Sequence, residues 1–146
     1  MKNILITGGA GFIGYHLSKA LLKKNFNIDI FDNLSRGKLD KDLKKLLKNN
    51  KINFKKVDLN KPFFIKKNYQ YIFHLAATVG VKNVNINPSL TIYNNIMPLF
   101  SMINFINKKN IKTKIILFST SEVYSPLLND KKKFPFSEKN SIPLSN

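Results

Sequence analysis

The sequence predicts an α/β protein built on a doubly wound parallel sheet, because strand-like apolar runs alternate with amphipathic helical patterns. A second observation is that the first apolar run ends in a cluster of glycines, which opens a helical pattern. A third is that polar residues follow directly after the predicted strands. Ligands of open parallel sheets bind beyond the carboxyl ends of the strands. The three observations therefore predict a ligand site at that edge of the sheet.

Composition limits the class of protein. The chain has 146 residues and 43% hydrophobic content, which suffices for one domain with a core. No apolar run approaches the roughly 18 residues that a membrane span needs, and the first segment lacks the plan of a signal peptide. Cysteine is absent, which excludes disulfides and thiolate metal sites, and neither His16 nor His74 has a partner at metal-ligand spacing. We expect a cytoplasmic protein without a metal or a membrane partner.

The net charge of +17 raises the question of a nucleic-acid partner. Arg36 is the only arginine among the 25 basic residues, whereas proteins that read phosphates and bases favour the bidentate fork of arginine. The lysines are also scattered along a chain that is rich in Asn and Ile. We interpret the charge as a solvated lysine surface and predict no nucleic-acid partner, with polyanion binding as the alternative. Such a surface would still steer an anionic substrate toward the protein.

The apolar runs and helical periodicities predict the order of elements. Helices are expected at 12–24, around the leucines of 39–47 and at 89–108, and strands at 3–7, 28–31, 52–57, 71–75 and 114–118. The long last helix is expected to turn Ile92, Ile96, Phe100 and Ile103 inward, and Pro98 should kink it or break one turn. We predict a core over residues 1–124 and a loop-rich tail over 125–146.

The glycine cluster has the spacing Gly-x-x-Gly-x-x-Gly, formed by Gly8, Gly11 and Gly14. Glycines without Cβ atoms let the backbone approach a pyrophosphate, and the helix that follows points its positive end and free N–H groups at the phosphates. Phe12 and Ile13 lie in the first turn of that helix. These five residues are the candidate phosphate-binding loop of a dinucleotide site.

Two aspartates end predicted strands beside this loop. Asp32 stands 18 residues after Gly14, where a carboxylate accepts hydrogen bonds from the adenosine ribose, and Asn33 follows it. The carboxylate favours NAD over NADP because a 2′-phosphate would meet a like charge, although the nearby Arg36 can reverse this preference. Asp58, followed by Leu59, is placed to reach the adenine edge, and its alternative role is that of a capping or turn aspartate.

Five motifs in order resemble the extended short-chain dehydrogenase/reductase family, in particular its NAD-dependent nucleotide-sugar epimerases, dehydratases and decarboxylases. They are Thr7–Gly14, Asp32-Asn33-Leu34-Ser35, Asp58-Leu59, His74-Leu75-Ala76-Ala77 and Ser119-Thr120-Ser121-Glu122-Val123-Tyr124. The resemblance implies a Rossmann-type fold, NAD as the cofactor and a nucleotide-sugar substrate that is oxidised at C4 to a 4-keto sugar. It also allows a homodimer.

The same resemblance assigns roles to residues around the site. Leu75, Ala76 and Ala77 would line the cofactor, and Asn95 would buttress the site from the long helix. Near the end of the chain, Thr120, Ser121 and Glu122 would be catalytic. Thr120 would hydrogen-bond the sugar hydroxyl and Glu122 would act as acid or base on the ketosugar, unless it is a glutamate that complements a helix start. The chain departs from the family pattern where Pro98-Leu99 replaces Gly-Thr and Ser125 replaces Gly.

The family's catalytic Tyr-x-x-x-Lys pair has one formal match, Tyr15 to Lys19, which lies in the helix after the phosphate loop and is interpreted as coincidental. We expect the true pair just beyond Asn146, so that this chain is the inactive N-terminal part of a nucleotide-sugar enzyme. A stand-alone, non-catalytic NAD-binding module and a basic nucleic-acid-binding domain are the two alternatives.

Overall fold

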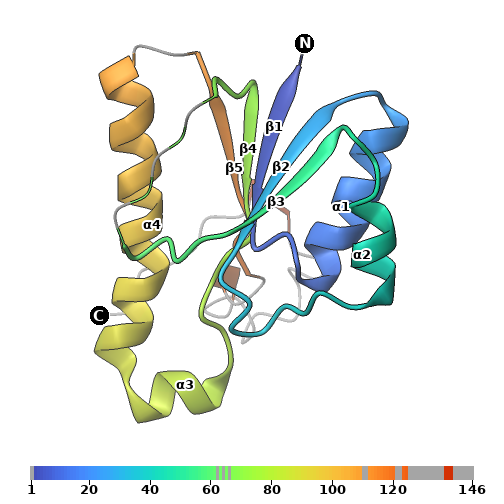
Figure 1. Cartoon of the computed structure of the whole chain (residues 1–146). Coiled ribbons are helices and arrows are strands. Elements are labelled where there is room, and N and C mark those ends of the chain that lie inside the picture. Colours follow the sequence, from blue (N-terminus) through green and yellow to red (C-terminus); the bar gives the residue numbers. More distant parts are fainter. Residues whose placement is uncertain are drawn as a thin grey trace.

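The computed structural model describes residues 2–61, 63, 65, 67–109, 112–120, 123–124 and 137–139. In this part of the chain five parallel strands form one sheet in the order β3-β2-β1-β4-β5 (Figure 1). The strands are β1 (Asn3–Thr7), β2 (Asn27–Asp32), β3 (Ile52–Lys56), β4 (Tyr71–His74) and β5 (Lys114–Leu117). The predicted parallel α/β architecture and its five strands are confirmed.

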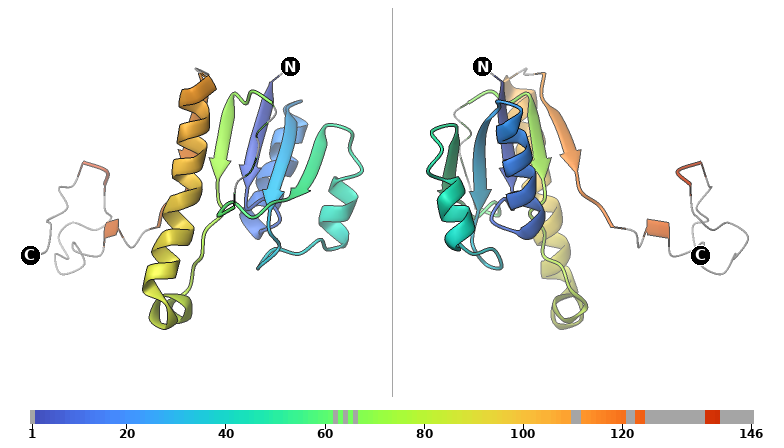
Figure 2. Two further views of the ribbon diagram at one scale, coloured as in Figure 1. Left: turned by 60° about the vertical axis from the view of Figure 1, so that its left-hand side comes forward. Right: turned by 90° about the vertical axis from the view of Figure 1, so that its right-hand side faces the viewer.

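Helices cover both faces of the sheet. On one face lie α1 (Phe12–Lys23) and α2 (Lys41–Leu46), and on the other lies α4 (Pro88–Lys109), as Figure 1 shows with the sheet nearly edge-on and the right view of Figure 2 shows with α1 in front and α4 behind. A short helix, α3 (Val81–Ile86), precedes α4 beyond the carboxyl ends of the strands (Figure 1). Within the described residues, no helix combines the length and the apolar character needed to cross a bilayer. The two covered faces create two separate cores.

The central strand β1 supplies both cores because its side chains alternate between the faces. Ile4 and Ile6 are buried beneath α1 and α2, whereas Leu5 is buried on the α4 side. The α1-side core contains Ile4, Ile6, Ile28, Ile30, Leu43 and Ile52. The α4-side core contains Leu5, Phe31, Val57, Leu59, Ile65, Tyr69, Ile72 and Met102. Burial on both faces explains why these strands read as continuous apolar runs in the sequence.

One carboxylate lies within the α4-side core. Asp29 of β2 is buried and accepts a hydrogen bond from the Tyr69 hydroxyl at 2.5 Å and another from Lys67 Nζ at 2.9 Å. Burial, together with the hydrogen bond to Asp29, raises the pKa of Tyr69 well above its ordinary value, so that the hydroxyl stays protonated and donates. These bonds tie the segment before β4 to β2.

The predicted inward face of the last helix is wrong. Ile92, Ile96, Phe100 and Ile103 are between 37% and 59% exposed. The residues of α4 that pack into the core on this face of the sheet are Leu99, Met102, Phe105 and Ile106. The exposed and the buried sets of α4 residues both contain apolar side chains at helical spacing. Periodicity detects each such face of a helix but does not indicate which of the two packs against the sheet.

Two other local expectations also differ from the structure. The helix runs through Pro98 without a break, and α3 was not predicted. The remaining boundaries agree with the predictions to within a few residues. Of the predicted tail at 125–146, all residues except 137–139 lie outside the described part of the chain.

Candidate cofactor-binding site

The candidate site lies at the carboxyl edge of the sheet, where β1 stands between β2 and β4. Thr7, the last residue of β1, is in register with Phe31 of β2 and His74 of β4. The chain leaves β1 toward α1 on one face and leaves β4 toward α3 and α4 on the other (Figures 1 and 2). This divergence is the topological switch point at which open α/β sheets bind ligands. The sequence-predicted loops after β1, β2 and β4 therefore adjoin one another.

The glycine loop packs so closely that two of its positions exclude any side chain. Gly8 has a φ of +69°, and a Cβ there would lie 2.6 Å from the backbone nitrogen of Ala76. A Cβ at Gly14 would lie 2.4 Å from the Cα of Gly9, so that the first turn of α1 rests on the loop. The Gly8 N–H also donates to the carbonyl of Phe31 at 2.8 Å. Glycine at these positions is thus required by backbone contacts on both sides of the loop.

The N-terminus of α1 is built to receive an anion. Gly11 is its N-cap, and among the described residues no side chain caps the helix and no acidic residue lies in its first turn. The first-turn N–H groups of Phe12, Ile13 and Gly14 have no acceptor within the helix. Phe12 and Ile13 are exposed, and the positive end of the helix dipole points the same way. Unsatisfied donors and dipole together favour a negatively charged group at this point.

The Asp32 carboxylate accepts hydrogen bonds from two backbone N–H groups, one of which belongs to the glycine loop. Its Oδ2 accepts from the Ala10 N–H at 3.0 Å, and its Oδ1 accepts from the Leu34 N–H at 2.7 Å. Asn33 closes the next turn by accepting from Ser35 N–H at 2.9 Å. A carboxylate has about four lone-pair sites, so Asp32 keeps acceptor capacity for a further donor. The loop-fixing role was not predicted from the sequence.

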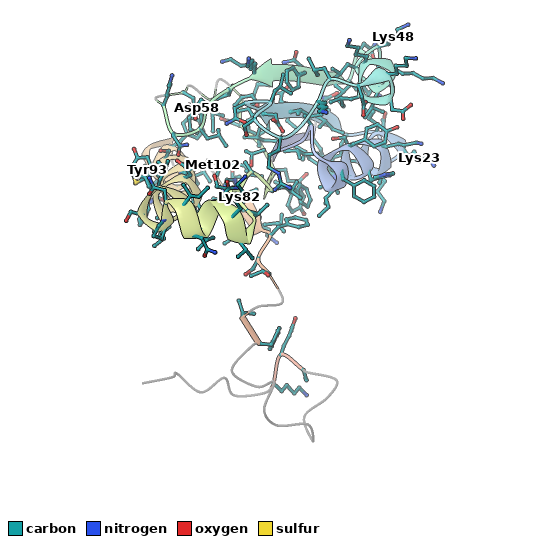
Figure 3. The ribbon with its side chains drawn as sticks, turned by 90° about the horizontal axis from the view of Figure 1, so that it is seen from below. Lys23, Lys48, Asp58, Lys82, Tyr93 and Met102 are labelled. Carbon is teal, nitrogen blue, oxygen red and sulfur yellow. The ribbon has the colours of Figure 1, made fainter. Side chains whose placement is uncertain are left out.

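The segment after β3 contains the second aspartate. Asp58 Oδ1 accepts from the Asn60 N–H at 3.1 Å, which is the turn role considered for it, and it lies on the α4 side of the site (Figure 3). The side chain of Leu59 is buried in the α4-side core. Contact of Asp58 and Leu59 with a cofactor stays a prediction.

A buried polar pair joins β1 to the loop after β4. The Thr7 hydroxyl lies 2.6 Å from Nδ1 of His74 and accepts from the Ala76 N–H at 3.4 Å. The hydroxyl has one proton and two lone pairs, so its hydrogen bond to Nδ1 fits either tautomer of the His74 ring. Burial lowers the pKa of His74 to about 4, so the ring is neutral at physiological pH. This geometry gives His74 a packing and hydrogen-bonding role beside the loop after β4.

The loop after β4 continues past this pair. Leu75 packs against the α1-side core, Ala76 packs against the α4-side core, and Ala77 is exposed. The loop thus crosses from one face of the sheet to the other beside Gly8.

Two consecutive asparagines of α4 hold the loops on the far side of the site. Asn95 accepts from the Thr78 N–H at 2.7 Å and donates to the Thr78 carbonyl at 3.0 Å. Asn94 Oδ1 accepts from Asn60 Nδ2 at 3.1 Å. Asn95 therefore acts through the loop after β4, whereas Asn94 and Asn60 were missed by the sequence analysis. Two adjacent asparagines within a helical pattern were the available signal, because asparagine is a poor helix former.

The predicted catalytic residues are only partly covered by the structure. Thr120 follows β5 at the carboxyl edge and is exposed, whereas Ser121 and Glu122 lie outside the described residues. In the Tyr-x-x-x-Lys match that the sequence analysis interprets as coincidental, Tyr15 packs against the α1-side core and Lys19 is exposed. The described residues contain no group of three or more side chains suited to hold a metal ion.

The fold and the site together define a dinucleotide-binding type of α/β domain, and comparison with known proteins gives its family. Residues 4–144 match the model of the NAD dependent epimerase/dehydratase family. The chain belongs to this family.

Curated relatives include two plant enzymes. The chain is 31% identical to UDP-glucuronate 4-epimerase 3 of Arabidopsis thaliana, over 94% of the chain and 33% of that protein. It is 33% identical to UDP-glucuronic acid decarboxylase 6 of the same plant, over 95% of the chain and 40% of that protein. The chain thus spans about one third to two fifths of the length of these relatives.

Solved structures agree with the fold. UDP-N-acetylglucosamine 4-epimerase from Methanobrevibacter ruminantium, solved in complex with UDP-N-acetylmuramic acid, superimposes with a TM-score of 0.78 at 33% identity, over 97% of this chain and 44% of that one. UDP-glucose 4-epimerase from Bifidobacterium longum, solved in complex with NAD+ and UDP, gives a TM-score of 0.82 at 24% identity, over 97% of this chain and 43% of that one. The second likeness is evidence of the fold alone.

The buried His74 predicts a pH-dependent stability. Its folded pKa of about 4 lies below the ordinary value of 6.5, so the unfolded chain binds the extra proton first as the pH falls. We expect His74 to lower the free energy of unfolding by up to about 3 kcal/mol between pH 6.5 and pH 4. The measurement is urea unfolding at several pH values, in which His74→Asn should have a shallower pH dependence than the wild type.

The matched control is His16→Asn, since His16 is exposed on α1. It should retain the pH dependence of the wild type. Equal pH slopes for the wild type and His74→Asn would contradict the assignment of His74 as a neutral buried group.

Proposed function

We propose that this chain binds NAD at the loop of residues 8–14, as part of an enzyme that acts on nucleotide sugars. The observation that carries the proposal is the uncapped N-terminus of α1, which rests on a loop whose glycines at positions 8 and 14 leave no room for a Cβ, at the switch point of the sheet. These residues fit a pyrophosphate because they offer free N–H donors and room for close backbone approach. When bound, the nicotinamide group accepts a hydride from the substrate; the residues of this chain bind and orient it.

The side chains around the loop support a dinucleotide rather than an isolated phosphate. The pyrophosphate is assigned to the N–H groups of Phe12, Ile13 and Gly14, and the adenosine ribose to the remaining acceptor capacity of Asp32. The adenine is assigned to the segment Asp58-Leu59, and the nicotinamide side to Leu75-Ala76-Ala77. The negative charge of Asp32 favours NAD over NADP, while the exposed Arg36 opposes that preference.

The nucleotide-sugar part of the proposal is supported by the family and by the names of the curated relatives, which act on UDP-glucuronate. We assign the Thr120 hydroxyl to a hydroxyl of the sugar, because Thr120 follows β5 at the same edge of the sheet as the glycine loop. Ser121 and Glu122 keep the catalytic roles that the sequence implies, with Glu122 as acid or base. We also propose that the chain divides into a cofactor-binding core at 1–124 and a tail at 125–146. We further propose that it forms a homodimer.

The choice between NAD and NADP tests the role of Asp32. Wild-type chain should bind NAD more tightly than NADP in isothermal titration calorimetry. Asp32→Asn removes a charge-assisted hydrogen bond of about 1.5–3 kcal/mol, which should weaken NAD binding roughly tenfold to a hundredfold. The same variant should bring the NAD and NADP dissociation constants closer together, because the 2′-phosphate no longer meets a carboxylate.

Asp42→Asn is the matched control, since Asp42 is exposed in the first turn of α2 and carries the same charge. It should leave both dissociation constants within about twofold of the wild type. An unchanged ratio of the two constants in Asp32→Asn would contradict the ribose assignment, and absence of NAD binding by the wild type would contradict the proposal.

The second prediction is that the chain alone does not catalyse a reaction of a nucleotide sugar. The chain mixed with NAD and UDP-glucuronate should yield no new sugar nucleotide by chromatography and no absorbance at 340 nm. The reason is that its only Tyr-x-x-x-Lys match contains Tyr15, which packs against the α1-side core. Turnover above the protein-free background would contradict this prediction. Turnover that Tyr15→Phe abolishes would identify that match as catalytic, whereas NAD binding without turnover is the result that we expect.

A further inference from the structure

The amino edge of the sheet, opposite the candidate cofactor site, has an unbalanced positive charge. Helices of a parallel sheet return to this edge, so that the residues before each strand and after each helix gather there (Figure 1). The lysines of this edge are Lys2, Lys23, Lys24, Lys48, Lys51, Lys67, Lys112 and Lys114. Among the described residues the one carboxylate near this edge is Asp29, which is buried and already paired with Lys67. By contrast, Asp32, Asp40, Asp42 and Asp58 lie toward the carboxyl edge.

Within this edge the structure contains a hollow, which we call the lysine pocket. Its volume is about 340 Å³. Its lining consists of Lys2, Lys24, Asn25, Phe26, Asn27 and Lys51, without a carboxylate. Three lysines and two asparagines thus line this space, together with the phenyl ring of Phe26 and the apolar stems of the lysines.

The backbone fixes the positions from which these side chains extend. The Asn27 N–H donates to the carbonyl of Lys2 at 3.1 Å, and the Ile28 N–H donates to the carbonyl of Lys51 at 2.7 Å. Asn25 lies two residues beyond α1 in the left-handed conformation, with a φ of 65°, and its side-chain oxygen accepts from Lys51 Nζ. The pocket is therefore formed by the starts of three adjacent strands and the end of one helix.

The chemistry of the lining selects the kind of ligand. Lysine is a compact point charge that binds phosphate, and amide N–H groups add donors to the same oxygens. The C-terminus of α1 contributes a partial negative charge, which one lysine is enough to offset. The positive charges of the other two lysines of the pocket are then uncompensated.

We propose that the lysine pocket binds a phosphoryl anion, of the size of pyrophosphate, at a second site that is separate from the cofactor site. The five residues of β1 separate the pocket from the glycine loop by roughly 16 Å of strand. A ligand can therefore occupy either site without touching the other. This inference does not depend on NAD binding at the glycine loop.

The experiment compares two double variants of the full chain that lose the same charge at the same edge. Lys2→Gln with Lys51→Gln removes two ammonium groups from the pocket, and Lys23→Gln with Lys48→Gln removes two outside it. Inorganic pyrophosphate is titrated calorimetrically at low and moderate salt, in the presence of excess NAD. We expect saturable binding that weakens at least tenfold in the pocket variant and less than twofold in the control variant.

A second measurement uses the unaltered chain and so needs no variant to fold. In ¹H–¹⁵N spectra, pyrophosphate should shift the amides of residues 24–27 and 51, even in the absence of NAD. Shifts confined to residues 9–14 would assign the anion to the glycine loop and overturn the proposal. Equal weakening in both double variants would also overturn it, because the charge would then act diffusely.

The final arm identifies the source of the phosphoryl group. ADP and a short single-stranded oligonucleotide are titrated alongside pyrophosphate. Binding of pyrophosphate or ADP that the pocket variant selectively loses supports a small-ligand site. Binding of the oligonucleotide alone, with equal loss in both variants, would show a general polyanion-binding surface and refute the pocket.

Discussion

The close approach of the glycine loop to β2 and β4 is the constraint on which the site depends. The chain must leave β1 between two neighbouring strands and enter α1 at once, and only a backbone without Cβ atoms at Gly8 and Gly14 passes through this space. The same approach brings the α1 N-terminus to the switch point of the sheet, where its free N–H groups face a possible ligand rather than a capping side chain. One backbone path therefore both packs the loop and leaves the N–H donors of the first turn of α1 without a capping side chain.

Polar side chains then hold the surrounding loops at fixed places. Asp32 fastens the glycine loop to the turn after β2, and Thr7 with His74 fastens β1 to the loop after β4. From α4, Asn94 and Asn95 hold the loops after β3 and β4. Each of these hydrogen bonds joins loops that surround the candidate site. The loops at the carboxyl edge of the sheet are therefore held in place in the absence of a ligand. Preorganisation of this kind lowers the cost of binding.

The fold, and the place of the glycine loop between β1 and α1, could be predicted from the sequence because both depend on local rules. Buried parallel strands read as apolar runs, and glycine spacing reflects contacts within a few residues. The inward face of α4 could not be predicted, since Met102 and Ile103 are both apolar and only the sheet decides which is buried. The Asn60–Asn94 bond joins residues 34 positions apart, which no local pattern reports. Likewise, the dual role of Asp32 required the position of Ala10 in space.

The molecule thus has two chemically different edges: a carboxyl edge with glycines, aspartates and a helix N-terminus, and an amino edge with lysines. The central claim is that a dinucleotide binds at the first. The most direct measurement is a ¹H–¹⁵N titration of the labelled chain with NAD. The account predicts saturable shifts at the amides of residues 9–14 and of residues 32–34, with little change at residues 24–27 and 51. Shifts centred on the amino edge, or none at residues 9–14 at saturation, would contradict it.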